Sequence, residues 1–124
     1  MIRPARRGDW PGIRALIALY PKQLVQKPVP KLGSFFVAES EGRLVGCCAL
    51  EIFSRRIAEI RSLSVAEGHT RQGLATALVA ACVRRAQRKR IREVITITSR
   101  VRLFKRSGFS TFNKEKIALF RIFE

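Results

Sequence analysis

The chain has 124 residues, of which 47% are hydrophobic, and its 25 Lys and Arg against 9 Asp and Glu give a net charge of +16. This length fits one domain over residues 1–124, and the apolar fraction supports a packed core, which excludes a disordered chain. Charged residues interrupt every apolar run, so we expect no membrane-spanning helix. The first residues show no signal peptide, because no apolar segment follows the early arginines. We therefore expect a cytoplasmic protein with no membrane partner.

The first third of the chain predicts a strand, a helix and a loop. A short strand-like stretch covers residues 2–6. A helix follows over about 10–20, with Asp9 as its N-cap and apolar residues at helical spacing. Three prolines and a closing glycine make residues 21–33 a loop.

The rest of the chain alternates between strands and helices. Strands are expected over residues 34–40, 41–54, 57–65, 93–98, 110–113 and 117–123, and the one over 93–98 is of the buried type. Helices are expected from Gly73 to about Arg90 and over 99–109, the second stopping at Gly108. This order predicts an α/β (α+β) fold, in which a mixed sheet carries helices and the unit over 57–98 is a parallel crossover.

The three cysteines do not form a metal site. Cys47 and Cys48 are neighbours on a strand, so their side chains point to opposite faces, and Cys82 lies far along the chain. We interpret all three as small buried thiols.

The turn between the strand over 57–65 and the next helix is a candidate phosphate site. The first turn of a helix leaves backbone N–H groups without intrahelical partners, and the helix dipole adds partial positive charge there. Gly73 and Ala75 let an anion approach the backbone closely, and Thr76 adds a hydroxyl. The spacing matches neither a Walker loop nor a dinucleotide fingerprint. Taken alone, the glycine is as consistent with a plain turn.

Three segments in order, "AEIRSLSV", "HTRQGLATALV" and "RLFKRSGF", give the chain a resemblance to the GNAT (GCN5-related N-acetyltransferase) superfamily. The family pattern Arg/Gln-x-x-Gly-x-Gly/Ala reads Thr70 to Ala75 here, with Thr70 in the place of the leading Arg/Gln. The resemblance implies a mixed sheet of about six to seven strands with three to four helices, splayed at its central parallel pair. Within the superfamily the chain is most similar to the N-acetylglutamate synthase-like branch, although its 21–33 loop is shorter.

The resemblance implies an acetyl-CoA-dependent N-acetyltransferase that moves an acetyl group directly to the amine of a small molecule or amino acid. It places the pyrophosphate on the backbone from Arg71 through Gln72, Gly73, Leu74 and Ala75 to Thr76. It places the pantetheine arm beside the end of the central strand, at Leu63, Ser64 and Val65, where unpaired backbone groups accept it like an added strand.

Glu59 is the candidate general base. It lies mid-strand between apolar neighbours, where partial burial would raise its pKa, and it matches the catalytic glutamate of the histone-acetylating branch. The alternative is that Glu59 forms an ion pair on the sheet face with Arg61 or with a basic turn residue.

Arg100 and Arg61 are the candidates for binding the acceptor. Arg100 follows a strand at its carboxyl end, and its place in "TSR" matches an arginine that binds the acceptor carboxylate in the synthase branch; a guanidinium fits a carboxylate bidentately. The alternative is that Arg100 is one of many exposed arginines and binds no acceptor.

We predict that no tyrosine acts as the general acid that protonates the leaving thiolate. Phe104 lies near the position where the family usually has a tyrosine, and the one tyrosine of the chain is Tyr20. Water, or the hydroxyl of Thr98 or Ser99, would then supply the proton to the thiolate. We interpret His69, the one histidine, as a loop residue.

Residues 84–92, "RRAQRKRIR", contain six basic residues. They are read either as a solvated helix end or as a contact for an acidic protein partner or nucleic acid. A competing interpretation of the chain is therefore a CoA-binding regulatory or interaction module with little catalysis, and a homodimer is also compatible with the sequence.

Overall fold

The computed structural model describes residues 1–70 and 73–111, together with 119, 121 and 123. The strands of this part are β1 (Ile2–Pro4), β2 (Phe35–Ser40), β3 (Arg43–Ile52), β4 (Ile57–Val65) and β5 (Glu93–Ile95). The α-helices are α1 (Trp10–Ala18), α2 (Leu74–Arg88) and α3 (Val101–Arg106). Two short 3₁₀ turns, η1 (Arg7–Asp9) and η2 (Leu32–Ser34), precede α1 and β2.

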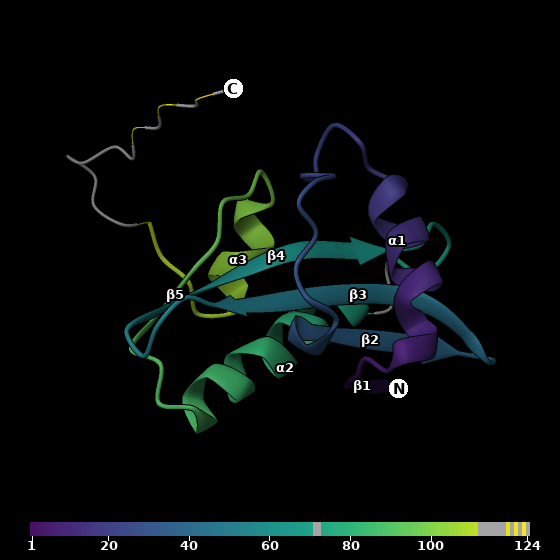
Figure 1. The fold of residues 1–124 in the computed structure, drawn as a ribbon, viewed down its shortest axis with the longest axis horizontal. Helices are drawn as coiled ribbons and strands as arrows, with labels where there is room; N and C mark the ends of the chain where they lie inside the picture. Colours follow the sequence, from purple (N-terminus) through teal and green to yellow (C-terminus); the bar gives the residue numbers. More distant parts are fainter. Residues whose placement is uncertain (71–72, 112–118, 120, 122, 124) are drawn as a thin grey trace.

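The strands form one mixed sheet in the order β1-β2-β3-β4-β5. Neighbours from β1 to β4 are antiparallel, and β5 pairs parallel to β4. The predicted α/β (α+β) fold and the parallel pair around α2 are confirmed. Figure 1 shows α1 near the carboxyl end of β4, while β5 and the C-terminal end of α2 lie toward the opposite end of the sheet.

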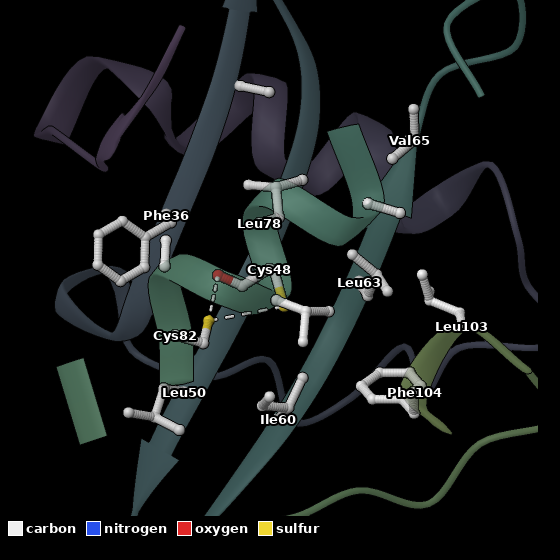
Figure 2. Close-up of a cluster of buried hydrophobic side chains, with 14 of the residues drawn as sticks. Phe36, Cys48, Leu50, Ile60, Leu63, Val65, Leu78, Cys82, Leu103 and Phe104 are labelled. Atoms are coloured by element: carbon white, nitrogen blue, oxygen red, sulfur yellow. Dashed lines mark hydrogen bonds between the residues drawn. The ribbon is translucent and has the colours of Figure 1, made fainter. Parts of the chain in front are cut away.

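Two apolar clusters cover the two faces of the sheet. Ile13, Leu16 and Ile17 of α1 pack with Phe35, Val37, Cys47 and Ala49. On the other face, α2 and α3 pack against alternate residues of β2, β3 and β4. Figure 2 shows Leu78 of α2 in this second cluster, with Leu63 and Val65 of β4 and with Leu103 and Phe104 of α3 nearby.

The three cysteines are buried free thiols, as predicted. Cys47 belongs to the α1 cluster, whereas its neighbour Cys48 belongs to the α2 cluster, where the Sγ atom of Cys82 lies 3.7 Å from its Sγ atom (Figure 2). Burial raises the pKa of the Cys47 thiol to about 12. In the described part of the chain, no group of three or more His, Cys, Asp or Glu residues could hold a metal ion.

Asp9 does not cap α1 with its side chain, contrary to the prediction. Its carboxylate instead accepts two hydrogen bonds from the guanidinium of Arg3, at 2.7 and 3.0 Å, and one from the backbone N–H of Arg6. Asp9 therefore closes the η1 turn and ties it to β1 rather than to the first turn of α1.

The strand predicted over residues 93–98 is half that length and is not buried. Val94 packs against the α2 cluster, but Ile95 faces away from it and is partly exposed, because α1 covers only the far end of the sheet. The five described strands are also fewer than the six to seven expected. The strands expected over 110–113 and 117–123 lie largely outside the described residues.

The ends of the two later helices agree well with the sequence. α2 begins after Gly73, and α3 is followed by Gly108 in the left-handed conformation, with φ +94°. Across the described ranges, no helix is long and apolar enough to span a bilayer.

Candidate active site

A pocket of about 500 Å³ opens where β4 and β5 separate. The two strands pair only between Ile57–Glu59 and Glu93–Ile95. One residue further, the hydroxyl of Thr96 donates to the carbonyl of Ile60, and in the described chain no strand pairs with the rest of that edge of β4. The predicted splay is therefore present. The pocket is lined by Tyr20, Gln23–Val25, Glu59–Val65, Thr70, Thr96–Arg100 and Phe104.

A β-bulge at Ser62 bends β4 along the wall of this pocket. Cys47 pairs with Ser64 and Ala49 pairs with Arg61, so β4 carries one residue more than β3 between these pairs. Ser62 has φ +58°, an uncommon value for a residue other than glycine. The extra residue reverses the side-chain alternation, which is why Ile60 and then Leu63 both face α2. Nothing in the sequence pattern had indicated this bulge.

The carboxyl end of β4 is anchored by two side-chain hydrogen bonds, one to α1 and one to the loop that follows it. The hydroxyl of Ser64 donates to the carbonyl of Leu16 at 2.7 Å, and the hydroxyl of Tyr20 donates to the carbonyl of Val65 at 2.6 Å. Sequence reasoning had assigned Tyr20 no place in the site. The structure brings it to the pocket wall, although 45 residues separate it from Val65.

Glu59 lines the pocket and is half-buried. It lies directly opposite Glu51 of β3. Burial raises the pKa of Glu59; the positive charge of Arg61 lowers it, and the negative charge of Glu51 raises it further. The raised pKa expected from the sequence is present, with desolvation as its main cause.

Arg61 also lines the pocket, but its guanidinium is engaged elsewhere. It forms an ion pair with Glu51 at 2.9 Å and donates to the carbonyl of Pro28 at 3.0 Å. Among the described residues Glu59 forms no ion pair, so the alternative that it pairs with Arg61 or with a basic turn residue is wrong. The partner of Arg61 is Glu51, which lies opposite Glu59 on β3. Arg61 links the sheet to the 21–31 loop, which carries one wall of the pocket.

Arg100 lies on the pocket wall opposite that loop, at the start of α3. Its backbone N–H donates to the hydroxyl of Thr98, so this turn presents Thr98, Ser99 and Arg100 together. Arg100 is exposed, and among the described residues its guanidinium makes no ion pair. The structure thus brings Glu59, Arg61 and Arg100 to a single pocket.

The predicted phosphate turn lies beyond the pocket, at the start of α2. Gly73 is the N-cap of this 15-residue helix and has φ +73°, a left-handed conformation that glycine adopts without strain. Thr76 is exposed, Leu74 is half-buried and Ala75 packs into the core. Arg71 and Gln72 lie outside the described residues. His69 donates its backbone N–H to Ala66, as expected of a loop residue.

The basic residues of the 84–92 segment do not share one environment. Arg85 donates to the carbonyl of Gly33, and its guanidinium lies 4.0 Å from the centroid of the Phe36 ring. Burial lowers the pKa of Arg85. The other five, Arg84, Arg88, Lys89, Arg90 and Arg92, are exposed.

A mixed sheet that is splayed at its parallel pair, with a pocket at the splay and a glycine-started helix beyond it, defines an acyl-CoA-dependent N-acyltransferase. The chain belongs to the acetyltransferase (GNAT) family, whose model matches residues 6–109. The chain is thus an acetyl-CoA-dependent N-acetyltransferase.

Relatives of known sequence agree with this assignment. An uncharacterised N-acetyltransferase of Chlorobaculum tepidum is 31% identical over 120 residues, which cover 92% of this chain and 77% of that protein. An amino-acid acetyltransferase of Mycobacterium tuberculosis is 31% identical over 118 residues, covering 89% of this chain and 68% of that protein.

Solved structures agree as well. A Mycobacterium tuberculosis protein in complex with CoA superposes with a TM-score of 0.84 at 30% identity, covering 91% of this chain and 73% of that one. N-acetylglutamate synthase of Neisseria gonorrhoeae, in complex with coenzyme A and N-acetyl-glutamate, superposes with a TM-score of 0.80 at 26% identity. In that case the match covers 94% of this chain and 30% of the synthase. The predicted likeness to the synthase branch is therefore confirmed.

The described residues fit acetyl-CoA. An elongated donor with amide groups needs an open strand edge, and the edge of β4 beyond Ile60 is open toward the pocket. Its phosphates need backbone N–H groups at a helix start, and the first turn of α2 contains no acidic residue that would repel them.

Proposed function

We propose that the chain acetylates the amine of an amino acid or of a similar small molecule, with Glu59 as general base and Arg100 binding the acceptor carboxylate. The observation that carries this proposal is the pocket at the splay, whose wall contains both residues and the open edge of β4. Acetyl-CoA supplies an acetyl thioester there. The β4 backbone at Leu63 to Val65 and the α2 turn at residues 71–76 would hold it.

Each residue has a separate role in this proposal. The carboxylate of Glu59 accepts the proton that the ammonium group of the acceptor must lose before it can attack, and its raised pKa strengthens it as a base. Arg100 orients the acceptor through its carboxylate. A backbone N–H at the Ser62 bulge polarises the carbonyl that is attacked. The proton for the leaving thiolate comes from water or from Thr98 or Ser99.

Arg61 orients the acceptor site indirectly in this scheme. Its bonds to Glu51 and to the carbonyl of Pro28 hold the 21–31 loop against the sheet. We therefore assign Arg61 a positioning role and leave direct contact with the acceptor carboxylate to Arg100.

The proposal is tested by titrating acetyl-CoA and the acceptor separately. Acetyl-CoA should raise the melting temperature, because a ligand that binds the folded state stabilises it. Arg100→Ala should raise the KM of an amino-acid acceptor by about tenfold or more, the usual cost of a charged hydrogen bond, with unchanged acetyl-CoA affinity. Arg102→Ala, an exposed arginine of α3 outside the pocket lining, is the matched control. No thermal stabilisation by acetyl-CoA, or equal effects of the two variants, would refute the site assignment.

A second candidate activity, contact with an acidic protein or nucleic acid, is favoured by the end of the molecule that carries residues 84–92. The backbone N–H groups of Arg92 and Glu93 donate to the carbonyls of Arg55 and Arg56 in the β3–β4 turn. The exposed Arg55 and Arg56 therefore lie beside the exposed basic residues at the end of α2. Binding of a labelled RNA that weakens steeply with salt, and weakens further in Arg55→Ser/Arg56→Ser, would support this activity.

A further inference from the structure

The mouth of the pocket is apolar on two sides. Val25, in the loop after α1, is 61% exposed, and Ile97, in the segment after β5, is 69% exposed; both line the pocket. In Figure 1 these two segments both lie above β4 in the view. Single exposed apolar residues are ordinary on a protein surface, but two that border one cavity from separate segments form an apolar rim. Leu24 extends this rim toward the interior.

Among the residues that the structure describes, the pocket lining contains a single cation that forms no ion pair. The charged residues of its lining are Glu59, Arg61 and Arg100. Arg61 is already paired with Glu51 and bonded to the carbonyl of Pro28. One acceptor carboxylate can therefore bind Arg100, whereas a second finds no unpaired cation in the described lining. An unpaired charge in a partly enclosed site is costly.

From these two observations we infer that the preferred acceptor is a neutral amino acid with an apolar side chain, which lies against Val25 and Ile97, rather than glutamate. The inference rests on the proposed function, because it assumes that the amine of the acceptor lies at Glu59 and that its single carboxylate binds Arg100. Val25 and Ile97 are then the residues that determine specificity. Glutamate is disfavoured because its second carboxylate meets the apolar rim, where the described lining offers no second unpaired cation.

The test is thiol release with L-leucine, L-methionine, L-phenylalanine, L-glutamine and L-glutamate at saturating acetyl-CoA. The ratio of kcat/KM for the best apolar acceptor over glutamate should be at least about tenfold, within the range that one pocket contact supplies. Ile97→Arg adds a cation at the rim and should reduce this ratio at least about tenfold. Leu19→Arg adds the same charge at an exposed apolar residue outside the pocket lining, and should leave the ratio unchanged.

The outcomes separate this inference from the proposed function. Turnover that favours glutamate tenfold or more, with acetyl-CoA affinity intact, overturns the apolar acceptor and leaves the proposed function standing. A ratio that Ile97→Arg and Leu19→Arg change equally also overturns it, because the effect would then be one of overall charge. If acetyl-CoA binds but no amino acid of the panel is acetylated, this inference fails, whereas the proposed function, which also covers other small amines, fails if acetyl-CoA does not stabilise the chain.

Discussion

Glu59 is influenced by two charges of opposite sign on its face of the sheet. Glu51 lies directly across from it on β3, and Arg61 is two residues further along β4. Because Arg61 is paired with Glu51, the negative charge of Glu51 partly cancels the effect of Arg61 on the pKa of Glu59. The pair therefore leaves burial as the main influence on the pKa of Glu59, which stays raised. A base with a raised pKa retains more affinity for the proton that it must accept.

Glu51→Gln should move the acidic limb of the kcat/KM profile to lower pH. Glu51 raises the pKa of Glu59 by its own charge, and its removal also frees Arg61, which lowers that pKa. Both effects have the same sign, so Glu59 would remain deprotonated to lower pH. The measurement is kcat/KM against pH, with Glu41→Gln in the β2–β3 turn as control. An acidic limb that stays in place or moves to higher pH would contradict this account of Glu59.

The sequence could indicate Glu59 but not its partners. Alternation along residues 57–61 places Glu59 and Arg61 on one face, which is why an ion pair between them was a natural alternative. The register between β3 and β4 decides the matter, and it brings Glu51 into contact with Arg61. Tyr20 reaches Val65 only through the path of the loop after α1, which local pattern does not encode.

At the scale of elements, β4 and the start of α2 are the two elements that we propose to bind acetyl-CoA. The bounds expected for β4 from its sequence, residues 57–65, agree with those observed. The bulge at Ser62 was not foreseen, because a serine gives no sign of a positive φ and the bulge follows from the pairing with β3. The predicted length of β5 was too long. An apolar run of Val and Ile gives the same sequence pattern whether helices cover both faces of the strand or only one face.

Gly73→Val should weaken acetyl-CoA binding more than Thr70→Ala does. A Cβ at Gly73 would meet no atom within 4 Å, so its cost comes from the φ of +73°, which β-branched residues avoid. The backbone at the start of α2 would shift, and with it the N–H groups proposed for the phosphates. We expect a loss of about tenfold or more in affinity, corresponding to the usual 1–3 kcal/mol of strain. Isothermal titration with acetyl-CoA measures this, and equal losses in both variants would count against a backbone site.

Asp9→Asn should destabilise the fold at neutral pH, and less so in acid. The Arg3 guanidinium holds the pKa of Asp9 below its ordinary value, so this carboxylate stabilises the fold above its unfolded pKa. The contribution is lost as the pH falls through the folded pKa. The pair is largely shielded from solvent and Arg3 also binds Glu39, so a loss of about 1–3 kcal/mol is expected at pH 7. Urea unfolding at pH 7 and pH 3 measures it; an equal loss at both values would contradict the ion-pair explanation.

At the scale of the whole molecule, the sequence predicted the class of fold, and its candidate residues Glu59, Arg61 and Arg100 line one pocket of that fold. Element order and the segments around Gly73 were sufficient, because the parallel crossover, the splay and the helix start are properties of the backbone path. The acceptor side was less predictable. It depends on how the 21–31 loop folds against β4, and Arg61 fixes that loop through Glu51 and the carbonyl of Pro28.

The net charge of +16 is a property of the whole surface rather than of the pocket. Within the pocket lining, Arg61 is neutralised by Glu51, and Arg100 and Glu59 oppose one another. Most of the other basic residues that the structure describes are exposed, and there they attract anionic ligands over long range and raise association rates at low salt.

The most direct test of the account is detection of the N-acetylated acceptor by mass spectrometry, with the unaltered chain and with Glu59→Gln. At saturating acetyl-CoA, the unaltered chain should form the product. Glu59→Gln should lower the rate by about 10²-fold or more, the usual contribution of a general base, while acetyl-CoA affinity stays the same. Acetylation at an undiminished rate in Glu59→Gln would contradict the assignment of this pocket as the catalytic site.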